Sequence, residues 1–304
     1  MCCASRGAKA LEKVVVVVLS WNGLEDTLEC LKSLCQSDYP NLQIVVVDNG
    51  SEDGSCAVIA ELFPQVTLIA NSRNLGFVRG NNIGLDAGLR MHADLLLLLN
   101  NDTVVEPDCI SELVRALGQD EAIGIVGPLM QRTLRPDLID MGGDFDFWTG
   151  AVILRHFVPA MECNGLFPIS YVWGCGLMVR REVLERVGLL DERYIAYYED
   201  ADFCMRARAL GYGTAVATRA RMLHKVGRSG ERRFLWQTYM RLRNHILFFV
   251  SYARPYQLFT LVPALVVYQI PVMLLRTARL YLARKLMPRY KQRPISLWYR
   301  AKRE

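Results

Sequence analysis

The first stretch with the side chains for chemistry is a polar tripeptide that follows five consecutive leucines, Leu95–Leu99. It reads Asn100-Asn101-Asp102, and the carboxylate of Asp102 is its one anionic group. Mg²⁺ and Mn²⁺ prefer carboxylate and phosphate oxygens, so an aspartate here could hold a metal against a diphosphate. The competing interpretation is an Asx turn that caps the next segment, and this stretch alone leaves both open.

A second acidic cluster, Glu199-Asp200 with Asp202, follows the aromatic run Tyr194–Tyr198. Carboxylates this close in sequence should perturb one another's pKa. A base that takes the proton of an attacking hydroxyl is a role that such a cluster serves. Asp200 or Asp202 could also cap a helix over residues 203–210, which is compatible with catalysis.

One histidine lies in an unusual setting, because His224 opens the basic, glycine-containing stretch His224–Gly230. A lone histidine is more often structural than functional. We expect a flexible loop here, far from any helix interior, which makes His224 a candidate metal ligand if Asp102 also binds the metal.

Two further loops carry groups that could bind a nucleotide. Asp48, followed by Asn-Gly-Ser, could accept hydrogen bonds from a base or a ribose, although Asp-Asn-Gly is also a common turn. The stretch Asn74–Gly80 is predicted to be a glycine-rich loop before a helix that starts at Asn81, whose free N–H groups could bind an anion; a plain turn is the alternative. Arg79 could contact phosphate or face water. The absence of GxGxxG after the first strand argues against a dehydrogenase.

Buried strands that alternate with helices must position these polar groups. Continuous apolar runs predict buried strands at Val14–Leu19 and Leu95–Leu99, and two further strands are predicted at Ile44–Val47 and Val66–Ala70. The segments between them predict helices, at Leu24–Ser37, Asp53–Phe63 and Asn81–Met91. This order predicts an α/β fold, a parallel sheet with right-handed crossovers, whose strand ends bring the polar loops together at one edge.

The second half is less regular. Helices are predicted at Pro107–Leu117, Arg181–Val187 and Phe203–Leu210, short strands at Ile123–Pro128 and Ala215–Ala217, and a hairpin within Leu138–Leu154. Tyr171–Val179 is strand-like, but Gly174 and Gly176 interrupt it, which indicates a close approach of the backbone to another group.

Charge divides the chain unevenly. The 304 residues are 52% hydrophobic and carry a formal net charge of +5. From Arg276 to the end there are ten basic residues and one acidic residue, a net +9, which leaves −4 for the rest. A basic tail beside an apolar segment favours anionic lipid over nucleic acid, and we expect no nucleic-acid partner.

Nine cysteines without a CxxC pair favour a reduced, cytosolic protein. We expect no secretory signal, because Val14–Leu19 is too short.

An apolar segment, Gln257–Leu275, runs for 19 residues without a charge and contains Pro263 and Pro271. It could cross a bilayer, lie in the interface, or dock on the protein as a helix. Arginines on both sides fit poorly with one simple crossing.

The expected organisation is a disordered tail at 1–12, a catalytic domain at 13–235 with halves at about 13–105 and 106–235, and a helical tail at 236–304. We expect membrane contact through 245–304, at the cytoplasmic face of the cell membrane; the alternative is a cytoplasmic protein.

Seven motifs, taken together and in order, carry a resemblance to a known family. They read VVVVVLSWNG, VVDNGSEDG, NLGFVRGNNIGL, LLLLNNDTVVEPD, GCGLMVRREV, YYEDADFCMRARALGYG and MLHKVGRSG. From about Lys13 to Gly230 the chain resembles the inverting glycosyltransferases of family 2 with the GT-A fold, especially the rhamnosyltransferase-like branch. The resemblance implies a nucleotide-diphosphate sugar donor (UDP-, dTDP- or GDP-linked), a divalent metal (Mn²⁺ or Mg²⁺) and transfer to a hydroxyl with inversion.

The resemblance also assigns roles to residues. Trp21 and Asp48 match the nucleoside pocket, the Gly76–Asn82 loop lies beside the donor, Asp200 matches the catalytic base with Glu199 beside it, and His224 joins Asp102 in the metal shell. The nucleotide-sugar contacts expected on this basis are Ser20, Trp21, Asn22, Asp48, Asn49, Gly76, Arg79, Asn82 and Asn101. The residues expected to shape the sugar and acceptor pocket are Trp173, Gly174, Cys175, Gly176 and Tyr198.

This sequence departs from the family's pattern at two positions. Asn100 stands where the metal-binding DxD often has its first aspartate, which should shift metal binding toward Asp102, His224 and the diphosphate. Arg79 stands where smaller residues are common. A nucleotidyltransferase, a non-catalytic nucleotide-sugar binder and a membrane-associated scaffold are the rival interpretations. A lipid-linked or cell-envelope glycan is the expected acceptor.

Overall fold

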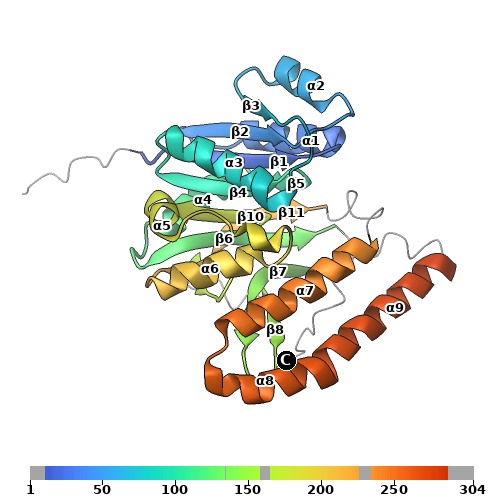
Figure 1. Cartoon of the computed structure of the whole chain (residues 1–304). Helices are drawn as coiled ribbons and strands as arrows, with labels where there is room; N and C mark the ends of the chain where they lie inside the picture. The colour runs from blue at the N-terminus through green and yellow to red at the C-terminus, as the bar shows by residue number, and fades with distance from the viewer. Residues whose placement is uncertain (1–10, 134, 158–164, 226–233, 287–304) are drawn as a thin grey trace, which may run out of the picture.

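The computed structural model describes residues 11–133, 135–157, 165–225 and 234–286. In this part of the chain, eleven strands form one mixed sheet, with helices on both faces (Figure 1). The main path runs β3-β2-β1-β4-β10-β6-β11-β5. Its strands are β1 Val14–Ser20, β2 Leu42–Asp48, β3 Thr67–Ala70, β4 Leu95–Asn100, β5 Thr103–Val105, β6 Ile123–Arg132, β10 Gly176–Arg180 and β11 Gly213–His224. The remaining strands are β7 Arg135–Asp146, β8 Ala151–His156 and β9 Leu166–Pro168.

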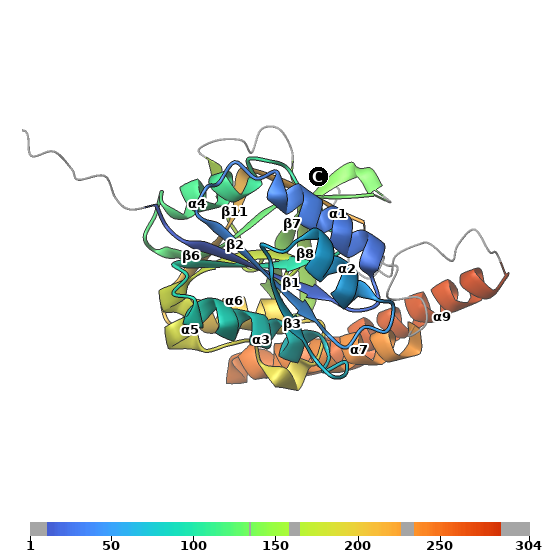
Figure 2. The same cartoon turned by 90° about the horizontal axis from the view of Figure 1, so that it is seen from above.

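The first four strands of the path are parallel, as the sequence predicts. Ser20 pairs with Asp48, and Leu19 pairs with Asn100, so the strands end side by side. Helices α1 (Leu24–Cys35), α2 (Ser55–Leu62) and α4 (Cys109–Leu117) contribute to the core on one face, and α3 (Phe77–Arg90), α5 (Arg181–Val187) and α6 (Glu199–Ala209) to the core on the other (Figure 2).

Small residues let α3 lie close to the sheet. A Cβ atom on Gly84 would lie 2.1 Å from Cγ1 of Val17, and one on Gly88 would lie 2.7 Å from Cδ2 of Leu96. Two glycines four residues apart share one face of a helix, so this face approaches β1 and β4 with no side chain between. The approach fixes the amino end of α3 against the edge where the strands end.

Several boundaries differ by a few residues from the sequence prediction. Helix α6 begins at Glu199 rather than Phe203, and its N-cap is Tyr198, not Asp200 or Asp202.

Three other differences also bear on the site. Helix α3 begins at Phe77 rather than Asn81, and its N-cap Gly76 has a φ of +89°, so the predicted loop is shorter. The strand predicted at Tyr171–Val179 is β10, which starts only at Gly176 and runs antiparallel to β4. The residues before it are held by loop contacts and one isolated bridge from Tyr171 to Gly143.

The third difference concerns β11, which is 12 residues long where a three-residue strand was predicted. Its last residue, His224, pairs with Thr103 of β5 and with Arg132 of β6. The prediction that His224 belongs to a flexible loop was therefore wrong. Two strands from remote parts of the chain hold the backbone of His224 in place, which a local pattern cannot reveal.

The carboxyl-terminal helices pack along the second half of the sheet. They are α7 (Phe234–Tyr252), the short turn η5 (Pro255–Gln257), α8 (Leu258–Ala264), the π-helical η6 (Leu265–Gln269) and α9 (Ile270–Leu286). Phe248 and Phe249 of α7 are fully buried and contact Phe145 of the predicted hairpin, β7–β8. Helix α7 is therefore part of the core.

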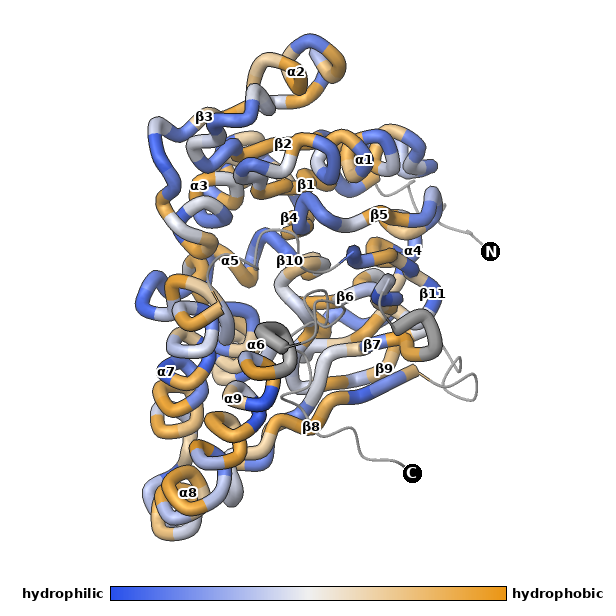
Figure 3. Tube along the Cα trace, turned by 90° about the vertical axis from the view of Figure 1, so that its right-hand side faces the viewer, coloured by the Kyte–Doolittle hydropathy of each residue, from blue (hydrophilic) through white to orange (hydrophobic). Residues whose placement is uncertain are grey.

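The segment Pro255–Leu282 is long and apolar enough to cross a membrane, by length and composition alone, and only 17% of its most apolar window is buried. The trace through α8 is coloured largely as hydrophobic (Figure 3). The predicted amino-terminal tail up to residue 10, the stretch Gly227–Gly230 and the basic tail beyond residue 286 lie outside the described residues.

Candidate active site

The loops after β1, β2 and β4 meet at one edge of the sheet, as the sequence predicts. The backbone N–H of Asn49 donates to the carbonyl of Ser20 at 2.8 Å. The hydroxyl of Thr27 in α1 is hydrogen-bonded to the Ser20 hydroxyl at 2.8 Å and accepts from Nδ2 of Asn101 at 2.9 Å. Ser20 is fully buried, so Ser20 and Asn101 hold the loops in register through Thr27.

Asp48 has one carboxylate oxygen available at this edge. The residue is 1% exposed, and its Oδ2 accepts the N–H of Ser51 at 2.8 Å. Its Oδ1 is buried and has no hydrogen-bond partner among the described residues. A buried acceptor without a donor is costly, so this oxygen is suited to accept from a bound ligand. Trp21 and Asn22 lie on the adjoining loop, where Oδ1 of Asn22 accepts the N–H of Glu52 at 2.8 Å.

Three predicted ligand contacts instead carry contacts within the protein. Asn49 donates to the carbonyl of Gly76 at 3.0 Å and accepts the N–H of Leu75 at 3.0 Å, so it shapes the turn before α3. Asn82 makes paired hydrogen bonds with the backbone of Leu190 at 2.9 and 3.0 Å. The third residue, Arg79, forms an exposed ion pair with Glu192, with 2.7 Å between Nε and Oε2.

Asp102 and His224 are in direct contact, although 122 positions separate them in sequence. Nε2 of His224 lies 3.1 Å from Oδ1 of Asp102, and both side chains are mostly buried. Burial lowers the pKa of His224, but the neighbouring Cys175 and Asp102 raise it more strongly, to about 10. The backbone N–H of Lys225 donates to the carbonyl of Asp102 at 2.9 Å, which holds the Asp102 backbone next to the end of β11.

An oxygen and an imidazole nitrogen side by side fit part of the coordination shell of Mn²⁺ or Mg²⁺. Within the described residues, no group of three or more His, Cys, Asp and Glu side chains is placed to hold a metal ion. The protein therefore offers two ligands, the carboxylate of Asp102 and the imidazole of His224, which has to lose its proton to bind a cation. Phosphate oxygens of a ligand would have to supply others.

Asp200 lies in the first turn of α6 and is held by backbone donors. Its Oδ2 accepts the N–H of Gly174 at 2.9 Å, and its Oδ1 accepts the N–H of Ala201 at 2.8 Å. A Cβ atom on Gly174 would lie 3.2 Å from Cβ of Asp200, so glycine permits this close approach. Burial raises the pKa of Asp200, and the two N–H groups oppose that shift. A half-buried carboxylate with a raised pKa is suited to accept a proton.

Glu199 occupies a different environment. It is 6% exposed, and burial, followed by the charge of Asp200, raises its pKa well above the usual range. The cation of Arg241 in α7 lowers the pKa of both carboxyl groups, and its guanidinium lies 4.0 Å from the centre of the Tyr197 ring. Sequence reasoning missed Arg241, because it lies in a helix with no motif around it.

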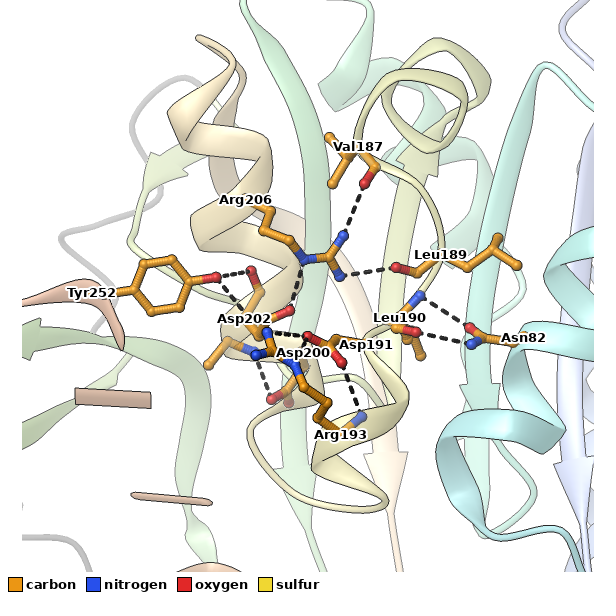
Figure 4. Close-up of polar contacts among 11 residues, drawn as sticks. Asn82, Val187, Leu189, Leu190, Asp191, Arg193, Asp200, Asp202, Arg206 and Tyr252 are labelled. Carbon is orange, nitrogen blue, oxygen red and sulfur yellow. Dashed lines mark hydrogen bonds and ion pairs between the residues drawn. The ribbon is translucent and has the colours of Figure 1, made fainter. Parts of the chain in front are cut away.

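Asp202 has a structural role. Its carboxylate accepts from Nε of Arg206 at 2.7 Å and from the hydroxyl of Tyr252 at 2.7 Å. Arg206 also donates to the carbonyls of Val187 and Leu189, at 3.0 and 2.9 Å, so this network links α6 to the loop after α5 (Figure 4). Asp202 thus links α6 to α7 and to the loop after α5, whereas Asp200 contacts Gly174.

A short segment, Trp173–Gly176, makes contacts both to Asp200 and to the strand end that leads into Asp102. Gly174 donates to Asp200, while the carbonyl of the next residue, Cys175, accepts the N–H of Asn100 at 3.2 Å. At Gly176, a Cβ would lie 2.7 Å from Cε of Met222, so the segment is tightly packed. The same tight segment therefore contacts the predicted base and the strand end that leads into Asp102, and its Cys175 lies near His224.

Two predicted pocket residues have aromatic or imidazole neighbours. The Trp173 ring lies 5.5 Å from that of Tyr171, nearly perpendicular to it, and the guanidinium of Arg132 lies 5.3 Å from the Trp173 ring. Tyr198 is hydrogen-bonded through its hydroxyl to Nδ1 of His245 in α7, at 2.7 Å. Tyr198 therefore connects the acidic turn of α6 to the carboxyl-terminal helices.

Comparison with known proteins agrees with this fold. The sequence profile described as Glycosyl transferase family 2 matches residues 15–188, which is more than half of the chain. The chain therefore belongs to glycosyltransferase family 2, and the protein is a glycosyltransferase.

Two relatives have names that are more specific. The chain is 28% identical over 219 residues to N-acetylglucosaminyl-diphospho-decaprenol L-rhamnosyltransferase of Mycobacterium tuberculosis, over 64% of this chain and 70% of that protein. It is 25% identical over 217 residues to the dTDP-rhamnosyl transferase RfbF of Shigella flexneri, over 70% of this chain and 69% of that protein. The similarity includes the rhamnosyltransferase-like branch expected from the motifs.

Solved structures share the GT-A-like fold. A mannosyltransferase from Pyrobaculum calidifontis, in complex with GDP-Man and Mn²⁺, matches with a TM-score of 0.59 and 19% identity, over 94% of this chain and 78% of that chain. GalNAc-T7 with UDP, GalNAc and Mn²⁺ matches with a TM-score of 0.61 and 17% identity, over 79% of this chain and 48% of that chain.

Proposed function

We propose that the protein transfers a sugar, with inversion, from a nucleoside-diphosphate donor to a hydroxyl of a lipid-linked or cell-envelope glycan. The observation that supports the proposal is the contact of Asp102 with His224, together with the segment Trp173–Gly176, which contacts Asp200 and the strand end before Asp102. The names of the two relatives support a rhamnosyl donor and, for one of them, a polyprenyl-linked acceptor.

The donor site is assigned to the edge where β1, β2 and β4 end. The unpaired Oδ1 of Asp48 would accept a hydrogen bond from the base or the ribose, with Trp21 beside it. Asn49 and Asn82 would act indirectly, since their hydrogen bonds hold the turn before α3 and the loop at Leu190. UDP-, dTDP- and GDP-sugars are all candidates.

Asp102 and His224 are the residues that would hold Mn²⁺ or Mg²⁺ together with the diphosphate. When bound, such an ion neutralises charge that builds up on the leaving diphosphate. Asn100, which replaces the first aspartate of the DxD pattern, donates its backbone N–H to Cys175. This hydrogen bond positions the loop, and the Asn100 side chain adds no charge to the site.

Asp200 is assigned as the base. Its carboxylate would take the proton of the acceptor hydroxyl as the oxygen bonds to the anomeric carbon from the face opposite the diphosphate. The bond from the anomeric carbon to the diphosphate oxygen breaks in the same step, and the nucleoside diphosphate leaves with its electron pair. One displacement inverts the anomeric centre. The raised pKa of Asp200 favours proton acceptance.

The proposed location is the cytoplasmic face of the cell membrane, with residues 13–235 together with the buried helix α7 as the catalytic domain and the segment after α7 as the membrane-associating part. The exposed apolar face of α8 and α9 supports this location. Burial of Phe248 and Phe249 adds that α7 belongs structurally to the catalytic core.

Incubation of the protein with a panel of UDP-, dTDP- and GDP-sugars, with Mn²⁺ and a polyprenyl-diphosphate glycan, tests the proposal. We expect one donor class to release nucleoside diphosphate with a glycosylated lipid of the opposite anomeric configuration. A nucleotidyltransferase would release inorganic diphosphate or consume a sugar phosphate, and a binding protein would release nothing. Either result would reject the proposed reaction.

A further inference from the structure

A cavity of about 440 Å³ lies outside the donor edge, between the turn of the β7–β8 hairpin and the helices α7, α8 and α9. The residues that matter for its chemistry are Tyr198, Arg241, His245, Tyr268, Val272 and Arg276. None of the described residues that line it is acidic, and two are arginines. The cavity is therefore suited to an anion, with aromatic and aliphatic groups beside it.

One end of the cavity lies beside the N-cap of α6, Tyr198, two residues before the proposed base Asp200. Arg241 lines this end, and its guanidinium lies 4.0 Å from the centre of the ring of Tyr197, in the segment that leads into the acidic turn of α6. Tyr198 lines the same end and is hydrogen-bonded to His245. A ligand in the cavity would therefore have one end close to Asp200.

The other end opens onto the apolar helices. Tyr268 lines it from the π-helical turn η6, and Val272 and Arg276 line it from α9. The Nε2 of Gln269 donates to the carbonyl of Thr149 at 3.1 Å and ties η6 to the hairpin turn. The π-helical turn precedes Pro271, whose missing N–H removes a helical hydrogen bond, and such turns often lie at functional sites.

The outer face of these helices is apolar and exposed. Phe259 is 83% exposed, Val267 76% and Leu275 65%. The inner face is buried, with Leu261 at 0% and Leu265 at 3%. An apolar face of this kind beside a cationic cavity matches an amphiphile that joins a phosphate group to a hydrocarbon chain.

We propose that this cavity binds the phosphate groups of a lipid-linked acceptor. Arg241 and Arg276 would hold the phosphates, the acceptor sugar would extend toward Asp200, and the hydrocarbon chain would follow the exposed face of α8 and α9. The inference rests on the proposed function and adds to it the place where the acceptor enters. It assigns the apolar helices a part in substrate binding as well as in membrane contact.

The test measures binding of farnesyl diphosphate to the full chain in metal-free buffer, so that the diphosphate does not bind at Asp102 and His224. Farnesol and inorganic diphosphate are the comparison ligands. We expect farnesyl diphosphate to bind at least about tenfold more tightly than either, since it alone has both chemical parts.

Arg276→Gln should weaken this binding about tenfold, because it removes a charged hydrogen-bond donor. Arg279→Gln is the matched control, since it removes the same charge from an exposed position on the same helix, outside the cavity. Val272→Trp fills the cavity and should also weaken binding. Circular dichroism verifies that each variant folds, and if one substitution disrupts folding the other keeps the test decisive.

Equal weakening by Arg276→Gln and Arg279→Gln would overturn the proposal, since it would indicate general attraction of anions to a basic helix. If inorganic diphosphate binds as tightly as farnesyl diphosphate, the hydrocarbon chain contributes nothing and the proposal of a lipid-linked ligand is rejected. If sedimentation shows a dimer that buries the exposed face of α8 and α9, that face belongs to an interface with a second copy of the chain. Binding of a nucleotide sugar in the presence of Mn²⁺, measured on the same preparation, tests the proposed function separately. If the donor binds and farnesyl diphosphate does not, only the cavity assignment fails.

Discussion

Asp200 and Glu199 are neighbours in the chain, but their surroundings differ. Asp200 accepts two backbone N–H groups and is half-buried, whereas Glu199 is buried with one oxygen, Oε2, that lacks a hydrogen-bond partner among the described residues. Both carboxyl groups have raised pKa values. We therefore assign proton transfer to Asp200, which is the more exposed of the two and is held by backbone donors.

The pH dependence should report on Arg241. A base works when it is deprotonated, so activity should fall as the pH drops through the pKa of Asp200. The Arg241 cation lowers that pKa, so Arg241→Gln should raise it and move the acidic limb of the kcat profile to higher pH. Arg208→Gln, on an exposed position of α6, should leave the limb in place. Equal shifts in both variants would indicate a general effect of net charge.

Metal removal should act through Asp102 and His224. Treatment with EDTA should abolish transfer, and Mn²⁺ should restore it. Because the protein offers two ligands, we expect Mn²⁺ to raise the melting temperature more in the presence of nucleoside diphosphate than alone. His224→Ala should remove most of that added stabilisation. Activity that is unaffected by EDTA would contradict the metal assignment.

The positions of the candidate residues were easier to predict from the sequence than the structure around them. Asp48, Asp102 and Asp200 follow runs of apolar or aromatic residues that mark the ends of buried elements, so their positions could be predicted. Arg241 could not, because it lies in a helix far from the acidic turn in sequence. The pairing of Asp102 with His224 was expected only from the family resemblance, and the structure shows the two side chains in direct contact. The roles of these residues remain predictions.

At the scale of elements, α7 supports the loop that precedes the proposed base. Asn244 is fully buried, and its Nδ2 donates to the carbonyls of Tyr194, Ala196 and Tyr197 at 2.7, 2.8 and 2.8 Å. Ile195, Tyr197 and Tyr198 have positive φ angles of 62°, 70° and 72°. Non-glycine residues adopt such angles only when surrounding contacts hold them, and Asn244 provides those contacts.

Asn244→Ala should therefore reduce both stability and turnover. Leaving buried carbonyls unpaired should lower the free energy of unfolding by about 2–3 kcal/mol, measured by urea denaturation. We expect kcat to fall more than the nucleotide-sugar affinity, because the loop leads into Asp200 and not into the donor edge. Tyr239→Phe, on an exposed position of the same helix, is the control. An unchanged kcat in a destabilised variant would restrict Asn244 to folding.

The parallel half of the fold was predictable, because long apolar runs with polar ends mark β1, β2 and β4. Helix α3 begins four residues earlier than predicted, since Gly76 supplies the positive φ of its N-cap. Strand β11 is longer than predicted because β5, β6 and β9 all pair with it. These pairings join remote segments, so propensity within β11 does not indicate its length.

At the scale of the whole molecule, the exposed apolar face of α8 and α9 should bind membranes. Val267→Glu together with Phe259→Glu should reduce sedimentation with anionic vesicles, because both side chains are exposed and apolar, and a carboxylate is costly in hydrocarbon. Leu62→Glu, at an exposed apolar position on α2, should leave sedimentation unchanged. Equal binding by all variants would place membrane contact elsewhere in the chain.

The most direct test of the whole account is the activity of Asp200→Asn, which keeps the size of the side chain and removes the base. We measure transfer to the acceptor and binding of the nucleotide sugar in parallel. The account predicts that transfer falls at least about 100-fold while donor affinity remains close to that of the wild type. An Asp200→Asn enzyme with nearly full transfer activity would contradict it.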